Sequence, residues 1–140
     1  MRHFTIVDMQ NNFCNNDLAD VEIIPNIVKQ IFKSRERGDH IIFTRDIKGT
    51  EIIPELTIEK NDTVLDKDQF GYINWKEYIK PGDEVTLCGA LTPIVASIAL
   101  TLKAIEGVEV SVLKDCCSIF STKDDEDLYK MMKTCHCNIH

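Results

Sequence analysis

The chain has too little positive charge for two classes of partner. It contains 16 Lys and Arg against 23 Asp and Glu, which gives a net charge of −7. A surface that binds nucleic acid or an anionic membrane needs a basic footprint, so we expect neither partner. The chain also lacks an apolar run long enough to span a bilayer, and its first residues lead directly into a predicted strand. We therefore expect no signal peptide and a cytoplasmic protein.

The six cysteines do not indicate a disulfide scaffold. A chain of 140 residues can bury a sizeable core without covalent staples, so reduced thiols are the expectation. We find no internal repeat, low-complexity tract or linker, and we predict a single domain over residues 1–140.

Short apolar segments alternate with amphipathic ones along the whole chain. The predicted strands cover residues 4–7, 40–44, 63–65, 84–88, 109–113 and 135–140. Predicted helices run from residue 24 up to Gly38, over 73–79, from 92 towards Gly107, and onwards from 121–122. Because parallel neighbours need crossover helices, this order predicts an α/β fold with a mostly parallel sheet covered on both faces.

Residues 85–97 (VTLCGALTPIVAS) form the segment around which the rest is organised. They are typical of a strand, a tight turn and the start of a helix, with Thr92 expected as the cap and Pro93 in the first position. Sites in α/β sheets lie at this point, beyond the carboxyl end of a strand and at a helix N-terminus. A nucleophile belongs here, but residues 92–95 offer only Thr, Pro, Ile and Val.

Three side chains near predicted strand ends are candidates for chemistry. Asp8 has two open interpretations, a general base or a carboxylate that organises the loop at residues 10–12. Lys67 could stabilise an anion, although a lone lysine between two aspartates is more often solvated. Cys116 could be a reactive thiolate near a lysine, but we favour a small buried side chain.

The C-terminal residues Cys135, His136, Cys137 and His140 resemble metal ligands in type but not in spacing. Adjacent ligands point to opposite faces of a strand, and no CxxC pair is present. We expect a last strand with two cysteines packed on one face, and no metal.

Four segments, in order, resemble the isochorismatase-like cysteine hydrolases, the group that includes nicotinamidases. They are residues 6–13 (IVDMQNNF), 41–46 (IIFTRD), 66–71 (DKDQFG) and 87–95 (LCGALTPIV). The resemblance implies a Rossmann-like three-layer α/β/α fold, a mainly parallel six-stranded sheet, and a homodimer or larger oligomer. It implies hydrolysis of amides, imides or vinyl ethers by an Asp–Lys–Cys triad without a cofactor, and a cis peptide bond at Ala90–Leu91.

Carried over by residue, the resemblance places the catalytic aspartate at Asp8, the lysine at Lys67 and the nucleophile at Val95. Valine has no lone pair with which to attack a carbonyl, so the triad is incomplete. The implied ligand-binding residues are Phe13, Phe70, Ala90, Leu91, Thr92 and Val95. Of the metal-binding motif Asp46 remains, but Lys48 replaces the histidine, and the segment after it is shortened.

These losses predict a catalytically inactive protein that binds a small polar ligand or a protein partner. The alternative is an active hydrolase that uses Asp8 and Lys67 with a relocated cysteine, Cys88 or Cys116. That alternative requires one of the two sulfurs to lie within hydrogen-bonding reach of Asp8. A third hypothesis is an interaction protein that keeps only the fold, in which case neither Asp8 nor Lys67 matters for its effect.

Overall fold

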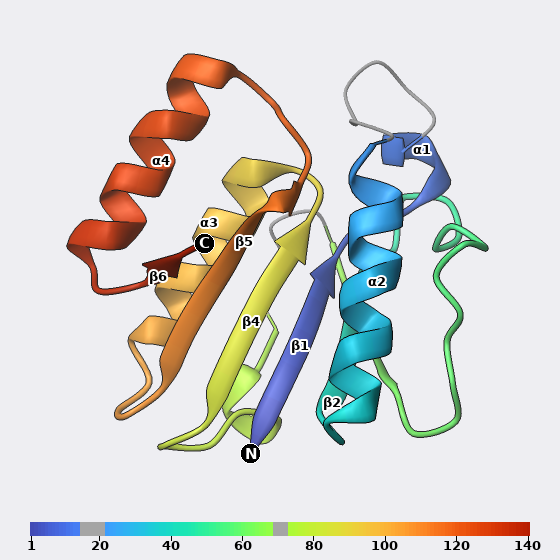
Figure 1. Cartoon of the computed structure of the whole chain (residues 1–140), viewed down its shortest axis with the longest axis horizontal. Helices are drawn as coiled ribbons and strands as arrows, with labels where there is room; N and C mark the ends of the chain where they lie inside the picture. The colour runs from blue at the N-terminus through green and yellow to red at the C-terminus, as the bar shows by residue number, and fades with distance from the viewer. Residues whose placement is uncertain (15–21, 69–72) are drawn as a thin grey trace.

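A computed structural model of the chain describes residues 1–14, 22–68 and 73–140, and its centre is one six-stranded, all-parallel sheet (Figure 1). The strand order is β3-β2-β1-β4-β5-β6. The strands are β1 (Arg2–Val7), β2 (His40–Asp46), β3 (Thr63–Lys67), β4 (Glu84–Gly89), β5 (Glu109–Cys117) and β6 (Asn138–Ile139). Within the described residues, no helix is long and apolar enough to cross a membrane.

Helices cover both faces of this sheet. One face is covered by α2 (Ile23–Glu36), and the opposite face by α3 (Thr92–Lys103), which packs against α4 (Thr122–Thr134) (Figure 1). A short α1 (Asn11–Cys14) follows β1. The predicted three-layer α/β/α fold with a six-stranded parallel sheet is therefore confirmed.

The two central strands, β1 and β4, are apolar because both of their faces are covered. Phe4, Ile6, Leu87 and Cys88 are all buried, the pattern expected of a parallel strand between helix layers. At its end β4 approaches β1 so closely that only glycine fits. A Cβ on Gly89, whose φ is +123°, would lie 2.2 Å from the backbone oxygen of Val7.

Several predicted boundaries are wrong. β3 extends to Lys67, so this lysine ends the strand instead of following it. β5 continues through Cys117 past an irregularity opposite β4, so Cys116 lies within the strand. The predicted helix over 73–79 is only a 3-10 turn, Trp75–Glu77, and α1 occupies part of the expected polar loop.

The last predicted strand is also much shorter than expected. β6 contains two residues, while Cys135 lies at the end of α4 and is exposed. Cys137 is buried, so the two cysteines do not pack on one face.

Candidate functional site

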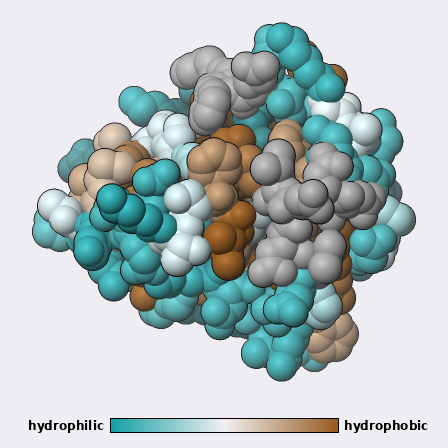
Figure 2. Space-filling view, turned by 90° about the horizontal axis from the view of Figure 1, so that it is seen from above, coloured by the Kyte–Doolittle hydropathy of each residue, from teal (hydrophilic) through white to brown (hydrophobic). Residues whose placement is uncertain are grey.

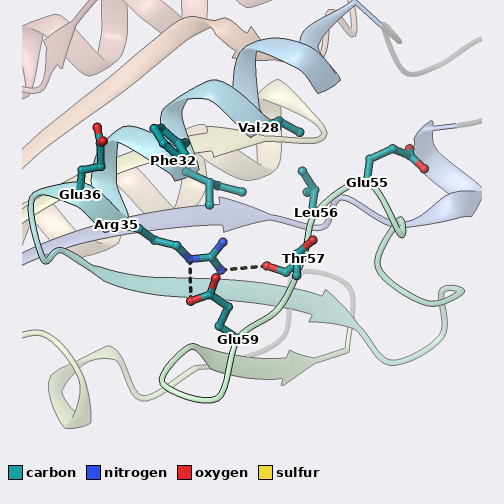
Figure 3. A pocket seen from close by; sticks show the side chains of 9 residues that line it. Val28, Phe32, Arg35, Glu36, Glu55, Leu56, Thr57 and Glu59 are labelled. Carbon is teal, nitrogen blue, oxygen red and sulfur yellow. Dashed lines mark hydrogen bonds and ion pairs between the residues drawn. The ribbon is translucent and has the colours of Figure 1, made fainter.

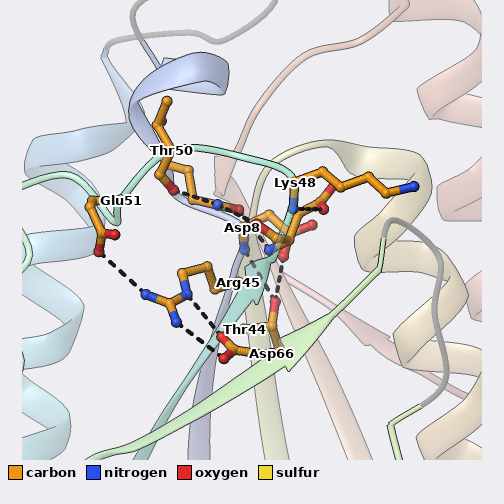
Figure 4. Close-up of polar contacts among 9 residues, drawn as sticks. Asp8, Thr44, Arg45, Lys48, Thr50, Glu51 and Asp66 are labelled. Atoms are coloured by element: carbon orange, nitrogen blue, oxygen red, sulfur yellow. Dashed lines mark hydrogen bonds and ion pairs between the residues drawn. The ribbon is translucent and has the colours of Figure 1, made fainter.

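Three neighbouring strands bring three polar side chains together at the carboxyl edge of the sheet. Asp8 follows β1, Thr44 lies on β2, and Lys67 ends β3. The Lys67 ammonium donates to Asp8 Oδ2 at 2.6 Å, and the Thr44 hydroxyl donates to Asp8 Oδ1 at 2.7 Å (the Thr44 contact is drawn in Figure 4). The structure therefore brings the predicted Asp8 and Lys67 into one buried ion pair.

Burial decides the electrostatics of this pair. Asp8 is fully buried and Lys67 is 5% exposed, so the interpretation of Lys67 as a solvated lysine is wrong. Burial raises the pKa of Asp8 above its ordinary value, although hydrogen bonds from Lys67 and Thr44 oppose that effect. The backbone of Asp8 has a φ of +48°, a left-handed conformation that aspartate tolerates better than most residues.

The Gln10 side chain organises the loop after β2. Its side-chain oxygen accepts the Asp46 N–H at 2.9 Å, and its amide nitrogen donates to the backbone oxygens of Asp46 (2.9 Å) and Thr50 (2.6 Å). A Cβ on Gly49 would lie 2.5 Å from that nitrogen. Sequence reasoning missed both Gln10 and Thr44, because nothing local marks a polar residue whose partners lie 36 to 40 positions away.

Exposed charges hold β2 to β3 beside the buried pair. Arg45 donates to both oxygens of Asp66, at 2.8 and 3.1 Å, and to Glu51 at 3.3 Å (Figure 4). This two-bond contact fixes the end of β3, and with it the position of Lys67.

Asp46 and Lys48, at the position where the resemblance implies a metal-binding motif, do not fit a metal ion. Asp46 Oδ1 accepts the backbone N–H of Lys48 at 2.9 Å, and the Lys48 ammonium lies 3.1 Å from Asp68. Across the described ranges there is no group of three or more His, Cys, Asp or Glu side chains suited to a metal. A lysine ammonium carries a positive charge and has no lone pair, so it cannot replace a histidine ligand.

The turn between β4 and α3 brings Val95 to the same edge. Ala90–Leu91 is a cis peptide bond, as the resemblance implies, and the Ala90 N–H donates to Val7 O at 2.8 Å. Leu91, and not Thr92, is the N-cap of α3. Thr92 is the first helical residue, and its hydroxyl donates to Ser118 O instead of capping the helix. Val95, in the first turn of α3, is fully buried.

The other predicted ligand-binding residues differ in how they are exposed. Ala90 and Thr92 are buried, whereas Leu91 and Phe13 are half-buried and so retain surface for a ligand. Phe70 lies outside the described residues. Figure 2 views this edge and shows hydrophobic residues gathered near its centre among hydrophilic ones. Ile119 and Phe120 follow β5 at this edge and are each more than half exposed.

The two cysteines proposed as relocated nucleophiles are buried and poorly ionised. Burial raises the pKa of the Cys88 thiol well above its ordinary value and that of Cys116 to about 11. Within the described residues, the side chains that bond the Asp8 carboxylate are Thr44 and Lys67, and neither sulfur is among them. The geometry therefore gives the relocated-nucleophile alternative no support.

Comparisons with known proteins bear on the family of the chain. Residues 4–139 match the sequence profile of the isochorismatase domain. No curated protein sequence matches the chain significantly.

Solved structures share the fold at low sequence identity. A pyrazinamidase of Pyrococcus horikoshii in complex with zinc has a TM-score of 0.80 at 19% identity, covering 99% of this chain and 98% of that one. A nicotinamidase from Staphylococcus aureus has a TM-score of 0.83 at 20% identity, covering 99% and 96%. The MAR1 ribonuclease from Caenorhabditis elegans has a TM-score of 0.83 at 22% identity, covering 98% and 74%. These structures establish the likeness of fold alone. With 136 of the 140 residues inside the matched domain, the chain belongs to the isochorismatase family.

Proposed function

We propose that this chain is a non-hydrolytic member of the isochorismatase family that binds a small polar ligand at the Asp8–Lys67 edge. One observation carries the proposal. A buried ion pair, with Lys67 Nζ and Asp8 Oδ2 2.6 Å apart, lies at the same sheet edge as the fully buried Val95, which occupies the predicted nucleophile position. The charged groups that support a hydrolase are kept while the atom that attacks the carbonyl is missing.

The site's composition indicates the class of ligand. The buried Asp8–Lys67 pair fixes the charge beneath this edge, and the half-buried Phe13 and Leu91 supply apolar surface. Small-molecule sites commonly combine an apolar lining with a few placed polar groups. A small aromatic amide combines an apolar ring with a polar group. We choose nicotinamide and pyrazinamide as probes, because the structural neighbours include a nicotinamidase and a pyrazinamidase.

An activity assay tests the non-hydrolytic part. The purified protein is incubated with nicotinamide or pyrazinamide and the release of ammonia is measured. We expect no release above that of buffer. Release that Cys88→Ala or Cys116→Ala abolishes would overturn the proposal and establish the relocated nucleophile.

Calorimetric titration with the same two amides tests the binding part. We expect heat of binding for the wild type and its loss in the double variant Asp8→Asn, Lys67→Met, which removes both charges together. The matched control is Lys48→Met, because Lys48 is exposed and pairs only with Asp68 in the described contacts. Absence of heat with both amides, or equal heat in the double variant, would count against a ligand at this edge.

A protein partner is the second candidate, and a groove between α2 and residues 55–59, lined by both apolar and charged side chains, favours it (Figure 3). The groove has a volume of about 450 Å³, and Val28 and Phe32, on its helix side, are 41% and 65% exposed. We propose that a second copy of this chain covers it, in line with the oligomer that the resemblance implies. Sedimentation of the wild type and of Phe32→Glu tests this. We expect the wild type to be a dimer and Phe32→Glu to be a monomer, and a monomeric wild type would refute the proposal.

We also propose a reducing, cytoplasmic setting. Five cysteines are free thiols, and four of them are buried, namely Cys88, Cys116, Cys117 and Cys137. Thiols in such number persist where glutathione and thioredoxin keep them reduced.

A further inference from the structure

A chain of polar side chains crosses the opposite, amino edge of the sheet, far from the site described above. His3 on β1 and His40 on β2 are direct neighbours in the strand register, and their Nδ1 atoms lie 3.1 Å apart. His40 Nε2 lies 2.7 Å from the Thr63 hydroxyl at the start of β3, and His3 Nε2 lies 2.9 Å from Asp83 Oδ2, just before β4. The contacts thus join the beginnings of four adjacent strands.

The chemistry of the end groups fixes the hydrogens of the neutral pair. Burial alone would raise the pKa of Asp83, but hydrogen bonds from the Lys80 N–H, His3 and the Met1 amine lower it to about 2. Asp83 is therefore an ionised acceptor, and His3 Nε2 must carry the hydrogen that it donates. Neutral His3 then offers a lone pair at Nδ1, to which His40 Nδ1–H donates, and His40 Nε2 accepts the hydroxyl hydrogen of Thr63.

The same geometry accepts one more proton but not two. If solvent supplies a proton to His40 Nε2, the Thr63 hydroxyl rotates and accepts, and every hydrogen bond is kept. A second proton must go to His3 Nδ1, where it faces His40 Nδ1–H at 3.1 Å with no lone pair between them. Both imidazole rings would then be positively charged, although they are in edge-to-face contact with their centres 5.2 Å apart.

We propose that the His3–His40 pair is an acid-sensitive contact between β1 and β2 at the amino edge of the sheet. The contact persists when the pair carries at most one added proton, and the two strands separate there when both rings are charged. His3 is 3% exposed, so the pair cannot relieve the repulsion by turning that ring into solvent. His40 borders a cavity of about 630 Å³ at this edge, into which the separated strands would admit water.

Other charged groups around the pair modify this behaviour without removing it. Asp83 and the Met1 amine lie on the His3 side. On the His40 side Asp62 favours the charged ring, but Asp62 is itself paired with Arg35. The remaining ionisable groups that line the cavity are Asp39, Glu59, Glu77 and Tyr78.

The sign of the pH effect follows from proton counting. Burial, and then the charge of His3, lower the pKa of His40 below its ordinary value. The unfolded chain binds a proton on each histidine below about pH 6.5, whereas the folded pair binds at most one. The unfolded state therefore binds more protons, and stability present above pH 6.5 is lost as the pH falls below it. Where the unfolded state binds one proton more than the folded state, the equilibrium constant for unfolding rises about tenfold for each unit by which the pH falls.

Histidine NMR titration of the wild-type protein is the direct test. We expect the ring of His40 to titrate below the ordinary range of histidine, and the signal of His3 to change in the same steps because the two rings are in contact. Titration of His40 within the ordinary range of histidine, with no change in the His3 signal over the same steps, would overturn the proposal. This arm needs no variant, so it does not depend on a substitution that disturbs folding.

Urea unfolding between pH 6.5 and 5 supplies the second test. We expect the wild type and His140→Gln to lose stability over this range. His40→Gln should lose little or none, because it removes the second ring whose charge would face His3. Equal pH dependence in the wild type and His40→Gln would refute the role of the pair.

Discussion

Replacing Lys67 by methionine tests the buried ion pair most directly. Met keeps most of the volume of the lysine stem but removes the ammonium 2.6 Å from Asp8 Oδ2. The fully buried carboxylate would then keep a single side-chain donor in the described contacts, the Thr44 hydroxyl. Breaking a buried pair on one side costs about 3–5 kcal/mol when the remaining charge stays ionised.

Protonation of Asp8 sets an independent limit on this cost. Holding a proton at pH 7 on a carboxyl with an unfolded-state pKa near 3.9 costs about 4 kcal/mol, and at pH 5 it costs only about 1.5 kcal/mol. Without Lys67, the pKa of Asp8 in the folded state rises further above its unfolded value. The folded variant then binds more protons than the unfolded chain, and its stability increases as the pH falls. The deficit relative to the wild type should therefore shrink by about 2–3 kcal/mol from pH 7 to pH 5.

Urea unfolding followed by circular dichroism measures both the stability deficit of Lys67→Met and its change between pH 7 and pH 5. Lys48→Met is the control, because its ion pair with Asp68 joins side chains that are 62% and 53% exposed. Such a pair contributes about 1 kcal/mol or less, with little pH dependence in this range. A deficit for Lys67→Met no larger than that of the control, or one that stays constant between pH 7 and 5, would refute the reasoning.

Three further outcomes follow from other parts of the structure. Gly89→Ala should destabilise the protein by about 3 kcal/mol or more, because its Cβ would overlap the Val7 backbone oxygen at a φ of +123°; a thermal shift of less than 2 °C would contradict this. Ser121→Ala should cost about 1 kcal/mol in urea unfolding, because the Ser121 hydroxyl accepts the Asp124 N–H at the start of α4, and Thr134→Ala at the other end of α4 should cost less. Cys135 should be modified by iodoacetamide at pH 8 before Cys117, since it is exposed while burial raises the pKa of Cys117 to about 12; mass spectrometry showing Cys117 modified first would refute it.

The sequence predicted the layers and the parallel sheet better than the details of the site. Apolar runs such as that around Ile42 identify buried strands because both faces of a parallel strand are covered. The end of β3 was missed, because Lys67 becomes compatible with a strand only once Asp8 pairs with it. Thr92 has the composition of a cap, but tertiary contact with Ser118 O takes its hydroxyl. Such long-range partners carry no local signal in one sequence.

The position of β1 within the sheet has a consequence for folding. β1 is the first strand in the chain but lies in the interior of the sheet, between β2 and β4. Its partner residues on β4 are 82 positions away, as in the register pair of Arg2 with Glu84. During synthesis, the apolar residues of β1 stay without their second neighbour until most of the chain has left the ribosome. Non-local parallel pairing of this kind is intrinsically slow and prone to aggregation. Yield from expression should therefore depend on chaperone capacity and growth temperature more strongly than the equilibrium stability of the finished sheet suggests.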